Sequence, residues 1–273
     1  LLVPVISNSQ PSISRSIKLL STDFDGTLVN HDAKPAVSPQ LFAALREVQA
    51  SGALWAVNTG RELAHIIEGL EEFGFPVEPD YVLTAEREVF HRGPDGQWQD
   101  YGDWNARCFT AHDQLFAGAG DLLAEIQAFL ETMPGAQSIR MGGQMIGLVT
   151  ATDADMDRVC EFLERERRRV PGFQFMRNTV YVRFCHEDYS KGTALGELGR
   201  LLGLSPEEIY ATGDHFNDLP MLDGQYARTV SCPSNAVPAV KQTVLAANGY
   251  VARGAVSEGF VEALQHFGMI RGS

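Results

Sequence analysis

Two carboxylates stand two residues apart in the segment Asp23-Phe24-Asp25-Gly26-Thr27. This segment directly follows the apolar run from Ile17 to Thr22, which is typical of a buried strand. Ligand sites of parallel sheets lie where the strands end. There Asp23 can attack phosphorus and bind a metal ion, while Asp25 can protonate a leaving oxygen and later deprotonate water. An acidic loop containing an Asx turn is the alternative interpretation of this pentapeptide taken alone.

A second motif, Asn58-Thr59-Gly60-Arg61, follows the apolar run from Ala53 to Val57 and opens a helical pattern. Free backbone N–H groups at a helix start, together with the Thr59 hydroxyl, form a cradle for phosphate. Taken alone the signal is weak, because threonine at a helix start is usually only a cap.

The third motif is Ser190-Lys191-Gly192, at the start of another helical pattern. Lys191 can neutralise phosphate charge and hold Asp23 in place, and such a contact matters most in a transition state. A single lysine near a helix start is more often a solvated surface residue, so this motif gains meaning only beside the others.

The fourth motif runs from Gly213 to Asp218 and again directly follows a predicted strand, here Glu208 to Thr212. Its oxygen-bearing side chains are suitable ligands for a hard divalent cation. We expect Asp214 to bind the ion, Asn217 to bond to phosphate and Asp218 to orient Lys191 or a metal-bound water.

The elements around these motifs predict an α/β fold. Short apolar strands alternate with helices before residue 87 and after residue 185, which indicates a Rossmann-like parallel sheet with helices on both faces. Between them the order becomes helix, hairpin, helix, hairpin, which indicates an antiparallel sheet covered on one face by helices. The expected elements of this second part are helices at 103–132 and 153–169 and hairpins at 137–150 and 173–184.

All four motifs fall on one edge of one predicted sheet, and in this order they resemble the haloacid dehalogenase superfamily. Gly213 to Leu222 is similar to the GDxxNDxxML form of the Cof-like IIB subfamily. The resemblance implies Mg²⁺ held by the Asp23 side chain, the Asp25 backbone carbonyl and Asp214. We add Asp218 to this metal group. It also implies that phosphate is held by Thr59, Gly60, Lys191 and Asn217, and that Asp23, Asp25, Thr59 and Lys191 are the catalytic set.

The spacing of the motifs locates an inserted domain. Asp23 and Thr59 are 36 residues apart, whereas Thr59 and Lys191 are 132 apart, so the insertion lies in the longer gap. This resembles the C2 cap arrangement of the family, in its smaller B form. We expect a tail at 1–16, a catalytic core at 17–86 and 186–273, and a C2B-type cap at 87–185. Where IIB members usually carry Asn-Gly after the third strand, this chain has Ala85-Glu86.

The function that follows is a magnesium-dependent phosphatase, which hydrolyses a small phosphorylated metabolite such as a sugar phosphate through an aspartyl-phosphate. Dehalogenases of the superfamily lack an acidic residue at the position of Asp25, so dehalogenation is disfavoured. A phosphomutase of the phosphomannomutase kind and a non-catalytic phosphate-binding regulator are the alternatives. Candidate specificity residues in the cap are Arg140, Gln144, Arg177 and Arg183, although exposed polar positions on hairpins explain them equally well.

Composition restricts the partners. The formal net charge of −13 repels nucleic acid, and no apolar run has the length that spans a bilayer. The basic run at 165–169 lies at the end of a helical segment, and we interpret it as a solvated helix end. Four scattered cysteines suggest reduced thiols rather than a zinc or disulfide framework. We therefore expect a cytoplasmic monomer or homodimer without a nucleic-acid or membrane partner.

Overall fold

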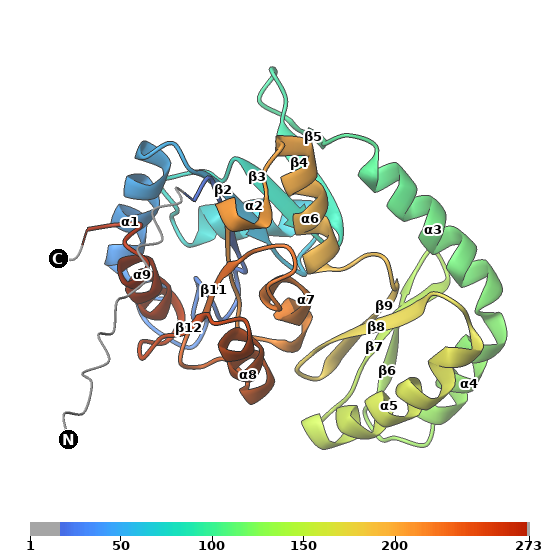
Figure 1. The fold of residues 1–273 in the computed structure, drawn as a ribbon. Coiled ribbons are helices and arrows are strands. Elements are labelled where there is room, and N and C mark those ends of the chain that lie inside the picture. Colours follow the sequence, from blue (N-terminus) through green and yellow to red (C-terminus); the bar gives the residue numbers. More distant parts are fainter. Residues whose placement is uncertain (1–16, 272–273) are drawn as a thin grey trace, which may run out of the picture.

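A computed structural model describes residues 17–271 and shows two layered parts, each built on its own sheet (Figure 1). The tail expected at 1–16 lies outside the described residues. The larger sheet has eight strands in the order β12-β11-β10-β1-β2-β3-β4-β5, and the smaller has four in the order β6-β7-β9-β8. The predicted fold class, a parallel α/β core with an added antiparallel sheet, is confirmed.

The larger sheet places the motif-bearing strands side by side. β1 pairs in parallel with β10 on one side and with β2 on the other, so the ends of these three strands meet at the centre of one edge. Parallel pairing extends to β3, β11 and β12, while β4 and β5 are antiparallel. The strands are β1 (Leu19–Thr22), β2 (Leu54–Asn58), β3 (Tyr81–Thr84), β4 (Glu88–Arg92), β5 (Trp98–Asp100), β10 (Ile209–Thr212), β11 (Thr229–Cys232) and β12 (Tyr250–Val251).

Helices cover both faces of this sheet. Successive residues of its central strands point to opposite sides, and because these residues are largely apolar, both faces must be buried. Leu20 packs with the first group of helices, and Leu19 packs with the second. The first group is α1 (Pro39–Ala50), α2 (Leu63–Glu72) and α9 (Val256–His266), and the second is α6 (Lys191–Leu202), α7 (Leu219–Leu222) and α8 (Pro238–Ala246).

The smaller sheet belongs to the inserted cap. Its helices lie along one face (Figure 1), and its own apolar cluster joins them to the strands. Phe173 and Phe184 are buried in that cluster beside Leu148. The elements are α3 (Trp104–Gly118), α4 (Gly120–Leu130), β6 (Gln137–Met141), β7 (Gln144–Val149), α5 (Asp153–Glu166), β8 (Phe173–Asn178) and β9 (Tyr181–His186).

The structure differs from the expected cap range of 87–185 at its first boundary. β4 and β5 fall within that range, yet β4 pairs with β3 and extends the core sheet. Trp104 and Cys108, in the first half of α3, also pack into the core cluster. This hairpin returns along β3 and satisfies its backbone groups there, so it belongs with the core sheet. We propose that the cap begins within α3, and that its second boundary lies near residue 186 as expected.

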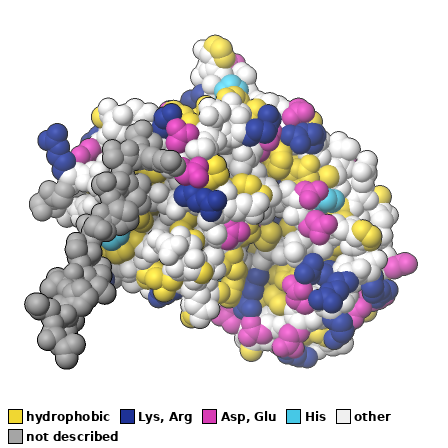
Figure 2. Space-filling model, in the orientation of Figure 1, with side chains coloured by type: hydrophobic (Ala, Val, Ile, Leu, Met, Phe, Trp, Pro, Cys, Tyr) yellow, Lys and Arg dark blue, Asp and Glu magenta, His cyan; other side chains and the backbone are white. Residues whose placement is uncertain are grey.

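Charges on the surface are mixed rather than segregated. On the face drawn in Figure 2, basic and acidic side chains lie interspersed. The basic run ends α5 and continues into a short 3₁₀ turn (Arg167–Arg169), where Arg165 pairs with Glu166, Arg167 with Glu164 and Arg169 with Glu125. These arginines are therefore neutralised locally. Within the described residues, no helix is both long enough and apolar enough to cross a membrane, and all four cysteines are free thiols.

His112 joins the two parts where the chain passes between core and cap. It lies on α3, and its Nε2 accepts the backbone N–H of His186 at the end of β9, at 3.1 Å. Burial, with smaller contributions from Arg87, His186 and Arg183, lowers the pKa of His112 to about 4, against the opposing hydrogen bond to the carbonyl of Cys108. The neutral imidazole is therefore the form that fits this junction.

Acid should weaken this junction. Because the folded pKa of His112 lies below its ordinary value, its contribution is present above about pH 6.5 and is lost as the pH falls toward about 4. We expect a loss of the order of 2 kcal/mol that His112→Gln does not show, with His65→Gln on the surface as control. Thermal unfolding at a series of pH values measures it. Equal pH dependence in the wild type and His112→Gln would contradict the assignment.

Candidate active site

The first motif lies at the centre of the sheet edge. β1 ends at Thr22, and the Asp23 N–H donates to the carbonyl of Thr212 at 3.0 Å, which fixes the start of the loop against β10. Gly26 has a φ of 78°, and a Cβ there would lie 2.5 Å from Oδ2 of Asp214. Glycine is thus required at this position for both backbone conformation and close approach. It lets the first and fourth motifs meet.

Lys191 is buried directly beneath the first motif. Its Nζ donates to Oδ1 of Asp23 at 2.7 Å and to Oδ1 of Asp218 at 2.6 Å. The backbone around it is also fixed, since Asn58 donates to the Lys191 carbonyl and Ser190 caps the helix through the N–H of Thr193. Burial alone would lower the pKa of Lys191, but Asp218 and Asp23 outweigh burial and raise it. Lys191 is therefore a fixed ammonium.

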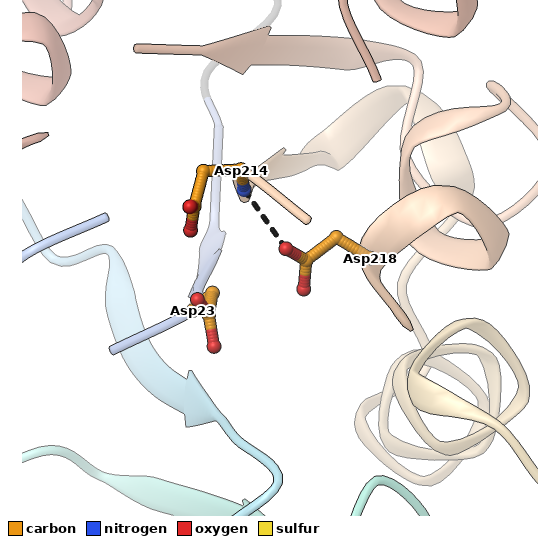
Figure 3. A group of neighbouring side chains, drawn as sticks. All are labelled: Asp23, Asp214 and Asp218. Carbon is orange, nitrogen blue, oxygen red and sulfur yellow. Dashed lines mark hydrogen bonds between the residues drawn. The ribbon is translucent and has the colours of Figure 1, made fainter. Parts of the chain in front are cut away.

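Three carboxylates converge beside this ammonium (Figure 3). Asp23, Asp214 and Asp218 each offer an oxygen that lies within 4.8 Å of the others. Thr27 donates to Oδ1 of Asp214 at 2.8 Å and lies 3.3 Å from Oδ2 of Asp23. Asp218 uses its second oxygen to accept the N–H groups of Asp214 and His215, both at 2.8 Å. Asp218 is thus fully engaged by the protein, whereas Asp23 and Asp214 line the cleft above.

The crowding of these acids shifts their pKa values. Burial raises the pKa of Asp23, Asp218 and Asp214 raise it further, and Lys191 opposes them. Burial and, to a smaller extent, Asp218 together raise the pKa of Asp214 to about 6. One ammonium does not compensate three neighbouring carboxylates, so a bound cation would stabilise their ionised forms.

Asp25 is held by two side chains. Arg61 donates to both of its oxygens, at 2.8 and 2.6 Å, and His31 Nε2 lies 2.6 Å from its Oδ1. Burial alone would raise the pKa of Asp25, but these hydrogen bonds outweigh burial and lower it. Asp25 is therefore kept as a carboxylate in this arrangement.

The second motif and Asn217 border the same space. Thr59 is buried directly after β2, and its hydroxyl accepts the N–H of Arg61 at 3.1 Å. Asn217 is buried in the 3₁₀ turn Phe216–Asp218 and donates to Oε1 of Glu86 at 2.9 Å. The residues expected to hold phosphate thus surround the Asp23 carboxylate from several elements of the core.

A cleft of about 580 Å³ opens above these residues, between the core and the cap hairpin β8–β9. Asp23, Asp25, Thr59, Gly60, Asp214 and Asn217 all line it. Lys191 and Asp218 lie beneath its surface. The further lining residues are Gly26, Arg61, Glu62, His65, Glu86, Asn178, Thr179, Tyr181, Arg183 and His215.

Of the four candidate specificity residues, Arg183 lines the cleft and the other three do not. Arg140 is exposed and bonds to Gly143, and Gln144 donates to the neighbouring carbonyl of Met145. Arg177 pairs with Asp153 and Asp157 and lies over the ring of Phe216, so it fastens the cap to the fourth motif.

Several lining residues were missed by sequence reasoning. Asn178, Thr179 and Tyr181 form the tip of the β8–β9 hairpin, and only the packing of that tip on the core brings them to the cleft. Glu86, which lines the cleft, and His31, which does not line it but contacts Asp25, were missed because neither lies in a motif. A signal for Glu86 was present, since it stands at the position where the chain departs from the expected Asn-Gly.

Comparison with known proteins agrees with this geometry. The family model of the haloacid dehalogenase-like hydrolases matches residues 20–85 and 143–259. A phosphoglycolate phosphatase of Methanoculleus marisnigri is 27% identical, over 92% of this chain and 97% of its own. A 5-amino-6-(5-phospho-D-ribitylamino)uracil phosphatase of Bacillus subtilis is 22% identical, over 76% and 85%.

The fold itself is shared with solved structures. The sucrose-phosphatase of Synechocystis sp. PCC6803, solved with sucrose and phosphate, superposes with a TM-score of 0.66 at 22% identity, covering 93% of this chain and 98% of its own. The family model spans well over half of the chain, including the loops that carry all four motifs. The expected family is confirmed: this chain belongs to the haloacid dehalogenase-like hydrolases.

Proposed function

We propose that this chain is a magnesium-dependent phosphatase that hydrolyses a small phosphorylated metabolite by way of a phosphate ester on Asp23. The observation that carries the proposal is the buried ammonium of Lys191 held between Asp23 and Asp218, beneath a cleft lined by Thr59, Gly60 and Asn217. Phosphoryl transfer requires an in-line nucleophile, fixed positive charge and donors for the equatorial oxygens. The phosphatase names of the relatives support the same class of enzyme.

The donor set beside Lys191 fits magnesium, because every ligand it offers is an oxygen. We propose that the carboxylates of Asp23 and Asp214 and the backbone carbonyl of Asp25 hold the ion. Asp218 was expected in this group, but both of its oxygens already accept hydrogen bonds, so we assign it to orienting Lys191 and the loop at Asp214. When bound, the ion supplies positive charge that offsets the charge of the transferring phosphate.

In the first half of the proposed reaction, a carboxylate oxygen of Asp23 forms a bond to phosphorus while the bond to the leaving oxygen breaks. A leaving oxygen that is not stable as an anion takes the proton of Asp25, which must first have taken up a proton from solvent and becomes a carboxylate in this step. In the second half, water attacks phosphorus, Asp25 accepts its proton, and Asp23 is released. The bonds from Arg61 and His31 stabilise ionised Asp25 and so support its role as the base more directly than its role as the acid.

The nucleophile is tested by Asp23→Asn, which keeps the volume of the side chain and removes its negative charge. Phosphate release from an aryl phosphate should fall by at least about a thousandfold, because the covalent route is lost. Asp32→Asn, an exposed change on the following loop, is the matched control and should retain activity. Near-normal phosphate release by Asp23→Asn, or isomerisation of a sugar phosphate without phosphate release by the wild type, would contradict the proposal.

Magnesium is tested on binding as well as on activity. Chelation should stop phosphate release, and added Mg²⁺ should raise the thermal unfolding midpoint of the wild type, because an ion that binds only the folded state stabilises it. Asp214→Asn should lose most of that thermal shift, while Asp32→Asn should keep it. A shift that is the same in wild type and Asp214→Asn would remove Asp214 from the proposed ligands.

Lys191→Met tests the buried ion network. The change leaves Asp23 and Asp218 without their shared cation, and removing one partner of a buried pair costs about 3–5 kcal/mol. We expect a much lower unfolding midpoint at neutral pH, partly regained in acid as the carboxylates take up protons, and no measurable turnover. An unchanged midpoint would show that the network does not hold the core together.

A further inference from the structure

Glu86 occupies a strained turn in the wall of the active-site cleft. Ala85 and Glu86, between β3 and β4, have φ values of 49° and 66°, which is uncommon for residues other than glycine. The strain is maintained by backbone bonds to the second motif, from Ala85 to the carbonyl of Arg61 and from Glu86 to that of Thr59. Strained residues held in this way are often functional.

The carboxylate of Glu86 is incompletely satisfied. The residue is 5% exposed, and its Oε1 accepts a hydrogen bond from Nδ2 of Asn217 at 2.9 Å. Its Oε2 is buried, as is Oδ1 of Asn217, and neither atom has a hydrogen-bond partner in the part of the chain that the structure describes. Two unpaired acceptors in the same wall mark a place where a bound donor would be stabilising, because an unpaired buried polar atom is costly.

Arg183 reaches the same place from the cap. Its Nη2 lies 3.5 Å from the carbonyl oxygen of Gly60, while Oε1 of Glu86 lies 3.3 Å from where a Cβ of Gly60 would be. The two side chains therefore flank Gly60, one from each domain. Burial alone would lower the pKa of Arg183, but the nearby Tyr181 and Glu86 help to raise it. Among the described residues, however, no ion pair within 4.0 Å joins Arg183 to Glu86.

We propose that Glu86 and Arg183 together bind a hydroxyl group of the substrate, on the carbon next to the phosphoester. A hydroxyl can donate to the carboxylate of Glu86 and at the same time accept from the guanidinium of Arg183. This inference rests on the proposed phosphatase function and adds a specificity-determining residue, Glu86, to it. Glu86 would contact the substrate from the core domain, so the selection of substrates does not depend on the cap alone.

Other groups fit this position less well. An ammonium satisfies Glu86 but has no lone pair for Arg183 and is repelled by its charge. A carboxylate pairs with Arg183 but is repelled by Glu86. A phosphate dianion has no proton to give to either unpaired acceptor, so the phosphate itself does not satisfy this wall.

The test uses four matched substrates that differ only in the group beside the phosphoester: ethyl, 2-hydroxyethyl and 2-aminoethyl phosphate, and phosphoglycolate. An aryl phosphate reports the basal chemistry. For the wild type, kcat/KM should be about tenfold higher for 2-hydroxyethyl than for ethyl phosphate, since a hydrogen bond to a charged group is worth about that factor. Glu86→Gln keeps an oxygen for Asn217, and the ratio of kcat/KM between two substrates of one variant is independent of any change that affects both substrates equally.

In Glu86→Gln the preference for hydroxyethyl over ethyl phosphate should fall several-fold, and phosphoglycolate should improve relative to ethyl phosphate. Arg183→Met should reduce the hydroxyl preference as well, and the two changes together should reduce it little further because both act on one group. Glu71→Gln, an equal change at an exposed position of α2, lies outside the cleft and should keep the wild-type preference. Circular dichroism establishes that each variant is folded.

Three results would overturn the inference. Equal loss on all substrates, the aryl phosphate included, would mean that Glu86 acts only through Asn217 on phosphate. An unchanged hydroxyl preference in folded Glu86→Gln and Arg183→Met would show that neither residue binds the hydroxyl of the leaving group. A wild-type preference for 2-aminoethyl phosphate would identify the bound group as an ammonium. In each case the wild type still releases phosphate, whereas no release from any substrate with Mg²⁺ would instead refute the phosphatase function.

Discussion

The buried ion network of Lys191, Asp23 and Asp218 is the interaction on which the rest of the site depends. An ammonium with no exposure to solvent is stable only if carboxylates surround it, and here it joins the ends of β1 and β10 through α6. That requirement fixes the three elements in one arrangement. The same network orients Asp23, and through Asp218 it holds the loop of Asp214. The same contacts thus determine the stability of the core and the geometry of the proposed catalytic site.

The division between core and cap follows from this arrangement. All the groups proposed for chemistry come from loops at one edge of the parallel sheet, where the backbone is held on both sides. The cap contributes the tip of the β8–β9 hairpin, and Arg177 fastens that hairpin over Phe216 of the fourth motif. Arg183 brings one cation from the cap into the cleft, opposite Glu86 of the core. Substrate selection in this account is shared by both domains.

Much of the fold was predictable because its signals are local. The strand Tyr81–Thr84 and the hairpin around Gly142 and Gly143 were predicted within a residue of their observed limits, since apolar runs and paired glycines mark them directly. β4 and β5 were missed because no local sequence pattern indicates that β4 pairs with β3 and β5 with β4. That pairing is set by tertiary contacts. The Arg61 clamp on Asp25 and the contact of Glu86 with Asn217 were missed for the same reason: each joins side chains far apart in the chain.

Phosphate transfer to Asp23 is the central claim, and chemical trapping tests it most directly. The enzyme is mixed with substrate and Mg²⁺, quenched within one turnover and treated with borohydride, which reduces an acyl phosphate to the alcohol. Peptide mass spectrometry then locates the modified residue. The account predicts conversion of Asp23 to homoserine, dependent on both substrate and Mg²⁺. Turnover without modification of Asp23 under conditions that trap a known aspartyl-phosphate, or modification of another residue in its place, would contradict it.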